Sequence, residues 1–333
     1  MATTRILFIG GTGVISRAVV ERCLDLGHEV TVLNRGSTTL RPVPDHVESL
    51  TADVRDEDAV DAALGTREFD VVADFLSFTP DHVGGWVDRF AGRTGQYLFV
   101  SSASAYQTPP ERLPVTESTP LRNPFWQYSR DKIACEDLLV EAYRDRDFPA
   151  TIVRPSHTYD RTMLPTIGHW TDIARMRAGK PVIVHGDGMS LWTITHARDV
   201  AVGIAGILGH HAAVGEAFHA TGDEAPTWNQ IYGWLADAAG VEPRLVHVAS
   251  ETIAAEHPAT GPGLLGDKSH SMVFDNEKLR ALVPGFGNTI RYQEGAREVI
   301  EFHDAHPELQ RVDEELDRVF DRLAERAGSA APA

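Results

Sequence analysis

Cysteine, long apolar runs and positive charge are all scarce in this chain. Its 333 residues include two cysteines, Cys23 and Cys135, which fall in separate segments of helical pattern. There is no CxxC motif and no Cys/His spacing typical of metal ligands, so the sequence predicts neither a disulfide framework nor a metal site. Two scattered cysteines are typical of a protein of the reducing cytoplasm.

No stretch approaches the roughly 18 consecutive apolar residues of a transmembrane helix. The apolar run at 6–9 is also too short for the hydrophobic region of a signal peptide. Lys and Arg number 31 against 48 Asp and Glu, which gives a formal net charge of −17. Because a field of that sign repels nucleic-acid phosphates and anionic lipids, we expect a cytoplasmic protein whose main partner is neither nucleic acid nor membrane.

The first half of the sequence alternates regularly between strand-length and helix-length patterns. Apolar strand patterns occur at 5–9, 28–34, 47–53, 69–78, 96–102 and 150–155. Helical patterns between them occur at 14–27, 56–64, 82–90 and 123–145. Because both faces of a parallel sheet need cover and crossover connections are right-handed, this order predicts an α/β fold with a doubly wound parallel sheet of the Rossmann type.

A glycine-rich turn stands between the first predicted strand and the first predicted helix. Glycine lets the backbone turn tightly and approach a pyrophosphate, whose negative charge is favoured by the free N–H groups of a helix start. A plain βα turn is the alternative, but strand and helix flank the motif as a dinucleotide site requires. We therefore predict cofactor contacts from Gly10, Gly11, Thr12, Gly13, Val14 and Ile15.

The alternation loosens beyond Arg154 into short segments punctuated by proline and glycine. We expect residues 1–154 to form the dinucleotide-binding Rossmann core and residues 155–330 to form a smaller substrate-binding region. The helical pattern at 196–208 carries an apolar stripe. Segments near 185–210 are therefore expected to pack back on the core.

The end of the second predicted strand bears on the choice of cofactor. Asn34 and Arg35 stand where a dinucleotide site usually places a carboxylate on the adenosine ribose. Loss of that carboxylate and gain of a guanidinium favour the 2′-phosphate of NADP(H). NAD(H) stays open, with Arg35 merely exposed or lying over the adenine. Asp53 and Val54 end the third strand; Asp53 is a candidate acceptor from the adenine amino group, or equally a helix cap.

Tyr128 and Lys132 lie four residues apart in a predicted helix, so both project from one face. A cation held there favours phenolate and lowers the pKa of the tyrosine toward the range of a general acid or base. An isolated YxxxK pair is more often a surface pair, but this one follows the strand end LFVSSASAY. Ser102 would emerge there at the carboxyl edge of the sheet, where doubly wound folds bind ligands.

In order and spacing, the motifs GGTGVIS, DVRD, VSSASAY, YSRDK and VRPSHTYD resemble the extended short-chain dehydrogenase/reductases, the NAD-dependent epimerase/dehydratase family. The resemblance implies that Ser102 holds a substrate hydroxyl and that Tyr128 moves its proton. It implies that Lys132 binds the nicotinamide ribose while tuning Tyr128. It further implies a nicotinamide pocket bordered by Phe75, Leu76, Ser77 and Pro155.

Departures from the family pattern narrow the expected chemistry. Ala103 and Ser104 stand where related 4,6-dehydratases carry an Asp-Glu pair, which disfavours elimination of water. Trp192 stands where related epimerases place an arginine on the substrate diphosphate, which suggests an unconjugated sugar or cyclitol stacked on the indole. The alternatives are that Trp192 belongs to the core and that Arg291 serves instead. His157 is a candidate hydroxyl contact or second acid/base, or a histidine bonded to backbone.

The sequence therefore predicts an NAD(P)-dependent oxidoreductase or epimerase that acts on a secondary alcohol or ketone of a sugar-like small molecule. Its candidate substrate contacts are Ser104, Trp126, His157 and Trp192. A nucleotide-sugar epimerase is one alternative. The chain also resembles a bacterial subgroup related to chloroplast stem-loop RNA-binding proteins, so a non-catalytic RNA-binding protein is the other, which the acidic charge opposes.

We also expect a homodimer. Proteins that resemble this one pair the helix after Asp81 and the YxxxK helix with their twofold mates, which closes a symmetric interface. Ile133, Leu138 and Cys135 are expected on the outer face of the YxxxK helix.

Overall fold

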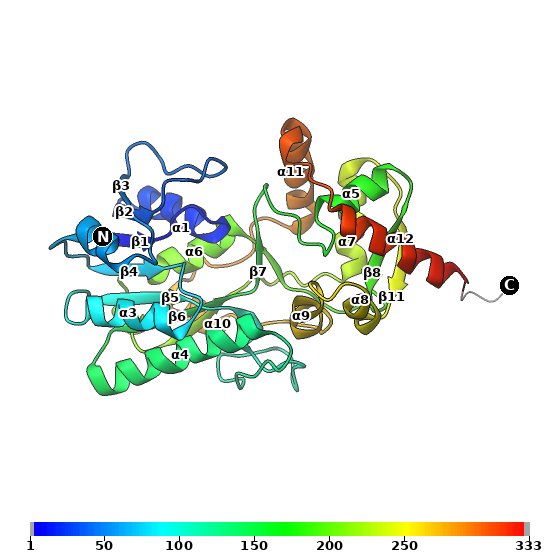
Figure 1. The fold of residues 1–333 in the computed structure, drawn as a ribbon. Coiled ribbons are helices and arrows are strands. Elements are labelled where there is room, and N and C mark those ends of the chain that lie inside the picture. Colours follow the sequence, from blue (N-terminus) through cyan, green and yellow to red (C-terminus); the bar gives the residue numbers. More distant parts are fainter. Residues whose placement is uncertain (1–2, 330–333) are drawn as a thin grey trace.

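The computed structural model describes residues 3–329 and shows a large α/β lobe followed by a smaller lobe along one axis (Figure 1). The large lobe is built on a seven-stranded, entirely parallel sheet with the order β10-β6-β5-β4-β1-β2-β3. Its strands are β1 (Arg5–Ile9), β2 (Glu29–Asn34), β3 (Glu48–Thr51), β4 (Val71–Asp74), β5 (Gln96–Val100), β6 (Ala150–Pro155) and β10 (Ala217–Ala220). The predicted doubly wound parallel sheet is confirmed.

Strand β1 shows how the sequence produces a sheet that is covered on both faces. Its four apolar residues are fully buried, and successive side chains point to opposite faces. Ile6 and Phe8 pack into one apolar cluster, while Leu7 and Ile9 pack into another. Helices α1 (Val14–Asp25), α6 (Ala197–Ile207) and α10 (Glu277–Leu282) cover the first face, and α2 (Glu57–Leu64), α3 (Pro80–Phe90) and α4 (Gln127–Arg146) cover the second.

The strand order reverses between β1 and β4, so the segments that follow these strands diverge at one edge of the sheet. Such a switch point is where open α/β sheets bind ligands. The glycine turn after β1, the 75–78 segment after β4 and the 101–106 segment after β5 all leave the sheet at this carboxyl edge. The fold thereby collects the predicted cofactor and catalytic segments on one side.

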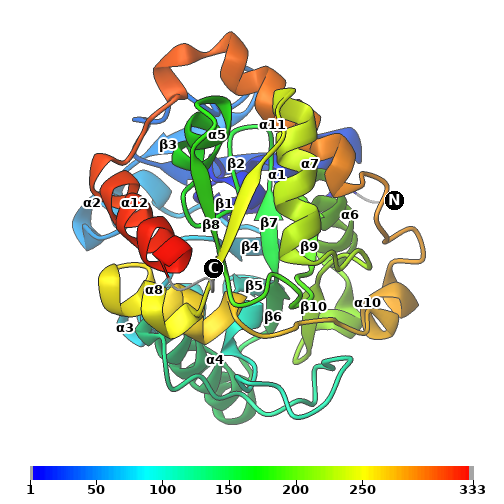
Figure 2. The same cartoon turned by 90° about the vertical axis from the view of Figure 1, so that its right-hand side faces the viewer.

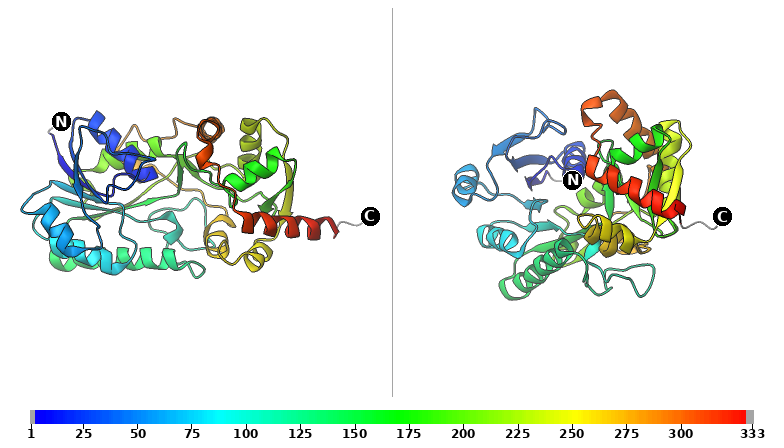
Figure 3. Two further views of the ribbon diagram at one scale, coloured as in Figure 1. Left: turned by 45° about the horizontal axis from the view of Figure 1, so that its top comes forward. Right: turned by 45° about the vertical axis from the view of Figure 1, so that its right-hand side comes forward.

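The smaller lobe is centred on the parallel strand pair β8 (Pro181–His185) and β11 (Arg244–Val248). Figure 2 shows this pair face on, with α7 (Trp228–Ala239) on one side and α12 (Glu314–Ser329) on the other. The remaining elements are α5 (Trp170–Arg177), α8 (Ser250–Glu256), α9 (Gly261–Gly263), a π-helical turn (Leu264–Lys268) and α11 (Tyr292–Ala305). Helix α12 leads to the end of the molecule farthest from the sheet (Figure 3).

The two lobes are joined by the parallel strands β7 (His157–Tyr159) and β9 (Ile194–His196). Short 3-10 turns complete the chain at Ala103–Ala105, His211–Ala213 and Pro307–Leu309. Among the described residues, no helix combines the length and the apolarity needed to cross a bilayer.

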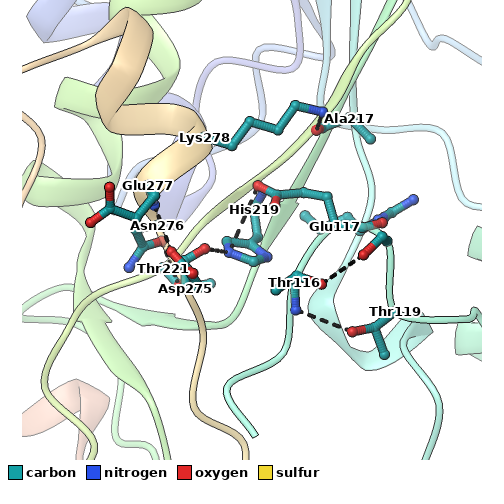
Figure 4. Close-up of polar contacts among 12 residues, drawn as sticks. Thr116, Glu117, Thr119, Ala217, His219, Thr221, Asp275, Asn276, Glu277 and Lys278 are labelled. Carbon is teal, nitrogen blue, oxygen red and sulfur yellow. Dashed lines mark hydrogen bonds and ion pairs between the residues drawn. The ribbon is translucent and has the colours of Figure 1, made fainter. Parts of the chain in front are cut away.

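Helix α6, within the 185–210 segment, packs on the sheet, and the chain contributes to the large lobe again farther on, because β10 forms the edge strand beside β6. His219 on β10 is fully buried, and its Nδ1 lies 3.2 Å from the hydroxyl of Tyr106. Figure 4 shows its ring beside Glu117 and the Asp275 carbonyl, which it contacts through Nε2. This strand lies beyond the regular alternation of strand and helix patterns, so the sequence does not assign it to the main sheet.

Helix α4 begins at Gln127, four residues later than the pattern predicts. The Asn123 side chain accepts hydrogen bonds from the N–H groups of Phe125 and Trp126, which holds the preceding segment in a turn. The expected outward position of Cys135 is wrong, because its side chain is fully buried between α4 and the sheet. Burial raises the pKa of its thiol to about 12. The dimer stays a prediction that rests on the neighbouring apolar residues.

A buried ion pair fastens α4 to the sheet. The side chains of Glu136 on α4 and Arg154 on β6 are 2% and 6% exposed, and Arg154 Nε donates to both carboxylate oxygens at 3.0 Å. The Ser101 hydroxyl, at the end of β5, donates to the same carboxylate. One charged group therefore holds three elements that reach the carboxyl edge.

We predict that Glu136→Gln lowers the free energy of unfolding by about 3–5 kcal/mol, because it leaves a buried guanidinium without its counterion. Urea unfolding followed by tryptophan fluorescence measures the change. The matched control is Asp88→Asn, which breaks the exposed pair between Asp88 and Arg146 (73% and 49% exposed). That substitution should cost less than about 1 kcal/mol. Equal losses in the two variants would contradict the prediction.

Candidate active site

The carboxyl edge of the sheet borders a cavity of about 1440 Å³ that residues of both lobes line. The large lobe contributes the glycine turn, the ends of β2 to β6 and the start of α4. The smaller lobe contributes residues near β7, residues beside β9 and the 259–268 segment that includes α9 and the π-helical turn. No group of three or more metal-ligating side chains is found within residues 3–329.

The glycine turn fits a dinucleotide closely. Gly10 and Gly11 have φ values of +116° and +91°, which disfavour any residue with a side chain. A Cβ atom on Gly11 would lie 2.7 Å from Val32 Cγ1, so this glycine serves packing and does not line the cavity. The other predicted turn residues do line it: Gly10, Thr12, Gly13, Val14 and Ile15.

Gly13 caps α1, so the helix N-terminus opens onto the cavity, and such an end attracts phosphate. Ser16, in the place of a third glycine, is buried, and its hydroxyl accepts a hydrogen bond from Gly13 N at 2.9 Å. A small side chain is tolerated there because it is used inside the turn. The positive φ values of the glycines, the open cavity beside the turn and the N-terminus of α1 together fit the pyrophosphate of a nicotinamide dinucleotide.

The turn after β2 contains no carboxylate. The Asn34 side chain is buried, and its Oδ1 accepts from Gly36 N at 2.7 Å, so that oxygen is used within the turn. Arg35 is exposed and lines the cavity beside Ser37 and Thr38. A guanidinium and two hydroxyls thus border the cavity beside this turn, and the two hydroxyls were not among the residues predicted from the sequence.

The other predicted cofactor residues lie as follows. Asp53, Val54, Phe75, Leu76 and Pro155 line the cavity. Asp53 accepts from Arg55 N at 3.0 Å and is not the cap of α2, because that cap is Asp56, which accepts from Ala59 N. The helix-cap alternative for Asp53 is therefore wrong.

Ser77 is fully buried and does not line the cavity. Its carbonyl oxygen accepts a hydrogen bond from Lys132 Nζ at 2.7 Å, and the Val100 carbonyl accepts another at 2.8 Å. The 75–77 turn is shaped by Asp74, whose carboxylate accepts from the N–H groups of Leu76 and Ser77. Ser77 therefore acts through its backbone, as a support for Lys132.

The structure brings Ser102, Tyr128 and Lys132 together on the cavity wall. Lys132 Nζ lies 5.9 Å from the centroid of the Tyr128 ring and is only 2% exposed as a residue. An ammonium has three N–H donors, and two of them are bound to backbone carbonyls. One donor is left for a ligand in the cavity.

Burial shifts the pKa values of this set. It lowers the pKa of Lys132 to about 8, although the Asp74 carboxylate acts in the opposite direction. It raises the pKa of Tyr128, with hydrogen bonding to Ser102 acting to lower it. The expected lowering of the Tyr128 pKa is therefore wrong for the chain by itself, because desolvation of the phenolate outweighs the stabilisation available to it.

A chain of serine hydroxyls orients Ser102. Ser129 Oγ on α4 donates to Ser104 Oγ at 2.8 Å, and Ser104 Oγ lies 2.9 Å from Ser102 Oγ. Ser104 lines the cavity but is buried, with its hydroxyl engaged by these two serines. Its predicted role as a substrate contact is thus weaker in the structure than a role in positioning Ser102.

Trp126, His157 and Trp192 all line the cavity. The Trp126 ring lies 4.9 Å from the Tyr128 ring, beside the reacting position. Burial lowers the pKa of His157 to about 3, which keeps the imidazole neutral, so a charged His157 is not available as a second acid. Arg291 is exposed and does not line the cavity.

Trp192 is 3% exposed, and the Lys268 ammonium lies over its ring, 5.4 Å from the centroid. Trp228 packs against the same indole with ring centroids 5.3 Å apart. A sugar stacked on the indole, as the sequence suggested, would compete with these side chains. The indole Nε1 is buried and has no hydrogen-bond partner within the described residues.

Three features of the site were missed from the sequence. Asp74 shapes the turn that supports Lys132, and Asn123 donates hydrogen bonds to the carbonyls of Ser104 and Gly266. Asp267 and Lys268 bring opposite charges to the cavity wall. The asparagine before α4 was a readable turn signal, whereas no motif marks the 267–268 pair, because it lies more than 100 residues from the catalytic set.

Comparisons with known proteins place this site in a family. The model of the NAD-dependent epimerase/dehydratase family matches residues 6–220. The chain is 27% identical to 2′-dehydrokanamycin reductase of Streptomyces kanamyceticus over 85% of this chain and 80% of the reductase. It is 26% identical to a chloroplast stem-loop binding protein of Arabidopsis thaliana over 73% of this chain and 65% of that protein.

An epimerase of Methanothermobacter thermautotrophicus shares the fold, with a TM-score of 0.76 and 14% identity over 92% of this chain and 94% of that one. The family match covers the glycine turn, the Ser102 segment, Tyr128 and Lys132 in one continuous stretch. The chain therefore belongs to the NAD-dependent epimerase/dehydratase family, the extended short-chain dehydrogenase/reductases, and is an enzyme of that type.

Proposed function

We propose that this enzyme reduces a ketone, or oxidises the corresponding secondary alcohol, on a sugar or cyclitol that carries no nucleotide. The observation that carries the proposal is the composition of the cavity wall. Ser102, Tyr128 and Lys132 adjoin the glycine turn there, and the only guanidinium groups among the described lining residues, Arg35 and Arg55, belong to the dinucleotide half. The substrate half lacks the fork that binds a diphosphate bidentately.

In the proposed mechanism, Tyr128 transfers a proton to or from the substrate oxygen. Ser102 donates a hydrogen bond to that oxygen, and the hydroxyl chain through Ser104 and Ser129 holds it in place. The remaining N–H of Lys132 would hold the ribose of the cofactor. The bound nicotinamide supplies or accepts the hydride. A phenol whose pKa is raised stays protonated, which suits proton donation to a ketone.

Net reduction is supported by the relative that aligns over 85% of the chain and is named a reductase. The neutral state of His157 leaves Tyr128 as the proposed acid/base. RNA binding, which the name of the stem-loop relative raises, has little electrostatic support in a chain of net charge −17.

We predict that Tyr128→Phe lowers kcat by at least about 100-fold, because the proton carrier is lost. Turnover is followed by nicotinamide absorbance with a panel of unconjugated sugars, cyclitols and their ketones. Cofactor affinity should change little. The control is Tyr143→Phe, an exposed tyrosine on the same helix, which should keep full activity. Wild-type turnover in Tyr128→Phe would reject the assignment.

We further propose that NADP(H) is preferred over NAD(H). The turn after β2 has no carboxylate to repel a 2′-phosphate, and Arg35 lines the cavity at that end beside two hydroxyl side chains, Ser37 and Thr38. A guanidinium makes charge-assisted hydrogen bonds to phosphate that an NAD ribose cannot accept in the same way.

Arg35→Ala should weaken NADPH binding by about tenfold to a hundredfold, the range of one or two charge-assisted hydrogen bonds, and leave NADH binding nearly unchanged. Fluorescence titration of both cofactors measures the preference. Arg55→Ala is the control, because Arg55 lines the same half but donates to the Leu76 carbonyl. It should affect both cofactors alike. Tighter binding of NADH by the wild type would overturn the proposal.

The absence of a diphosphate clamp is tested with nucleotides. In enzyme saturated with NADP⁺, which keeps them out of the cofactor groove, UDP and UDP-glucose should bind more weakly than about 1 mM, since no bidentate donor faces them. Calorimetry measures the affinity. The same titration with ADP in cofactor-free enzyme serves as the positive control. Micromolar affinity for UDP in the loaded enzyme would show that other residues form a clamp.

A further inference from the structure

Asp267 and Lys268 form a charged pair on the substrate side of the cavity. No sequence motif marks this pair. Their side chains are 18% and 17% exposed, both residues line the cavity, and Lys268 Nζ lies 3.8 Å from Asp267 Oδ2. Neither charged group makes a side-chain hydrogen bond within the described residues. The pair therefore presents unused donors and acceptors to the cavity.

The pair is held rigidly by backbone contacts. It ends a π-helical turn, a rare element that is frequent at functional sites. The Lys268 carbonyl accepts hydrogen bonds from His185, Trp228 and Ser190 at 3.0–3.3 Å. His185 and Trp228 are buried residues of two different elements of the smaller lobe. The position of Lys268 is thus fixed by the core of that lobe.

The same turn is fastened to the catalytic segment. Asn123 donates to the carbonyls of Gly266 at 2.7 Å and of Ser104 at 2.8 Å. A Cβ atom on Gly266 would lie 3.0 Å from both Asn123 and Trp126, so the turn packs directly on the segment that precedes Tyr128. Asp267 therefore follows a residue in contact with the catalytic region.

The charges of the pair also act on Tyr128 and His157. Burial is the main reason that the pKa of Tyr128 is raised, and the Asp267 carboxylate adds to the shift. Burial is likewise the main cause of the lowered pKa of His157, and the Lys268 ammonium adds to it. One member of the pair thus influences the reacting tyrosine, and the other influences the histidine across the cavity.

An independent feature points to a ligand at this place. Trp192 is 97% buried, lines the cavity and carries an Nε1–H without a partner, although buried polar groups are normally hydrogen-bonded. The Lys268 ammonium lies over the same indole. A buried polar group without a partner therefore adjoins the charged pair.

We propose that Asp267 and Lys268 form a paired-charge subsite that selects an uncharged, hydroxyl-rich ring. Hydroxyls of the ring donate to Asp267 and accept from Lys268. This inference rests on the proposed function, because it names the substrate class of the same cavity.

The physical basis is cancellation of charge. An anionic ligand that is attracted by Lys268 is repelled by Asp267, which lies within a few ångströms. A cationic ligand is attracted by Asp267 and repelled by Lys268. Neither recovers the cost of leaving water. A hydroxyl group is both donor and acceptor, so a polyol satisfies both charged groups without adding a charge of its own.

The test uses three methyl glucopyranosides that differ only at carbon 6: the neutral alcohol, the 6-amino-6-deoxy cation and the uronate anion. Binding is measured calorimetrically at neutral pH in enzyme saturated with NADP⁺, so the readout does not require turnover. The wild type should bind the neutral ring about tenfold more tightly than either charged ring.

Reciprocal variants should shift this preference in opposite directions. Asp267→Asn leaves a lone cation and should raise uronate affinity, relative to the neutral ring, by about tenfold. Lys268→Met leaves a lone anion and should do the same for the amino sugar. The control is Lys278→Met, which removes a partly exposed cation that pairs with Glu216 and does not line the cavity; it should leave all ratios unchanged. Thermal midpoints near that of the wild type establish that the variants fold.

Ratios that stay within about twofold of the wild type in both variants would overturn the proposal. So would a wild-type preference for a charged ring, equal affinity for all three rings, or failure of all three to bind. Tyr128→Phe separates this proposal from the proposed function. If Tyr128→Phe keeps its turnover while the affinity ratios shift in Asp267→Asn and Lys268→Met, the proposed mechanism fails and the subsite stands. If Tyr128→Phe loses turnover and those ratios do not shift, the mechanism stands and the subsite fails.

Discussion

The candidate active site depends on one buried ammonium. Lys132 is 2% exposed, and burying a cation is costly unless its donors are satisfied. The carbonyls of Ser77 and Val100 satisfy two of them, and these carbonyls belong to the turn after β4 and to the end of β5. The Asp74 carboxylate shapes that turn by accepting hydrogen bonds from the N–H groups of Leu76 and Ser77. The catalytic helix, two strand ends and the nicotinamide side of the cavity are therefore positioned by the same charge.

The same burial determines the proposed chemistry. Removing solvent lowers the pKa of Lys132 and raises that of Tyr128, so in the cofactor-free chain the tyrosine is a protonated donor rather than a prepared base. A carbonyl oxygen that gains negative charge during reduction needs such a donor. His157, made neutral by the same desolvation, adds a hydrogen-bonding group without adding charge. The low polarity of the cavity thus favours uncharged reacting groups throughout.

Much of the large lobe could be predicted from the sequence because its signals are local. The glycine turn, the YxxxK spacing and the alternation of strands and helices each lie within a few residues of the element that they specify. Other features depend on contacts between distant segments. The four residues of β10 became a sheet strand only through pairing with β6, and Cys135 faces inward because of how α4 packs on the sheet. The pKa of Tyr128 depends on burial, which residue spacing does not report.

Polar contacts cross between the two lobes at defined places. Asn123 joins the π-helical turn to the Ser104 segment, and the partly buried pair of Arg41 with Asp160 joins the loop after β2 to the segment after β7. In the proposed function, chemistry comes from strand ends that the sheet fixes, and substrate choice comes from a turn that the smaller core fixes. Because the two are linked by a few polar contacts at defined places, side chains on the turn, such as Asp267, can change without disturbing Lys132. Such a separation would let one fold act on different substrates.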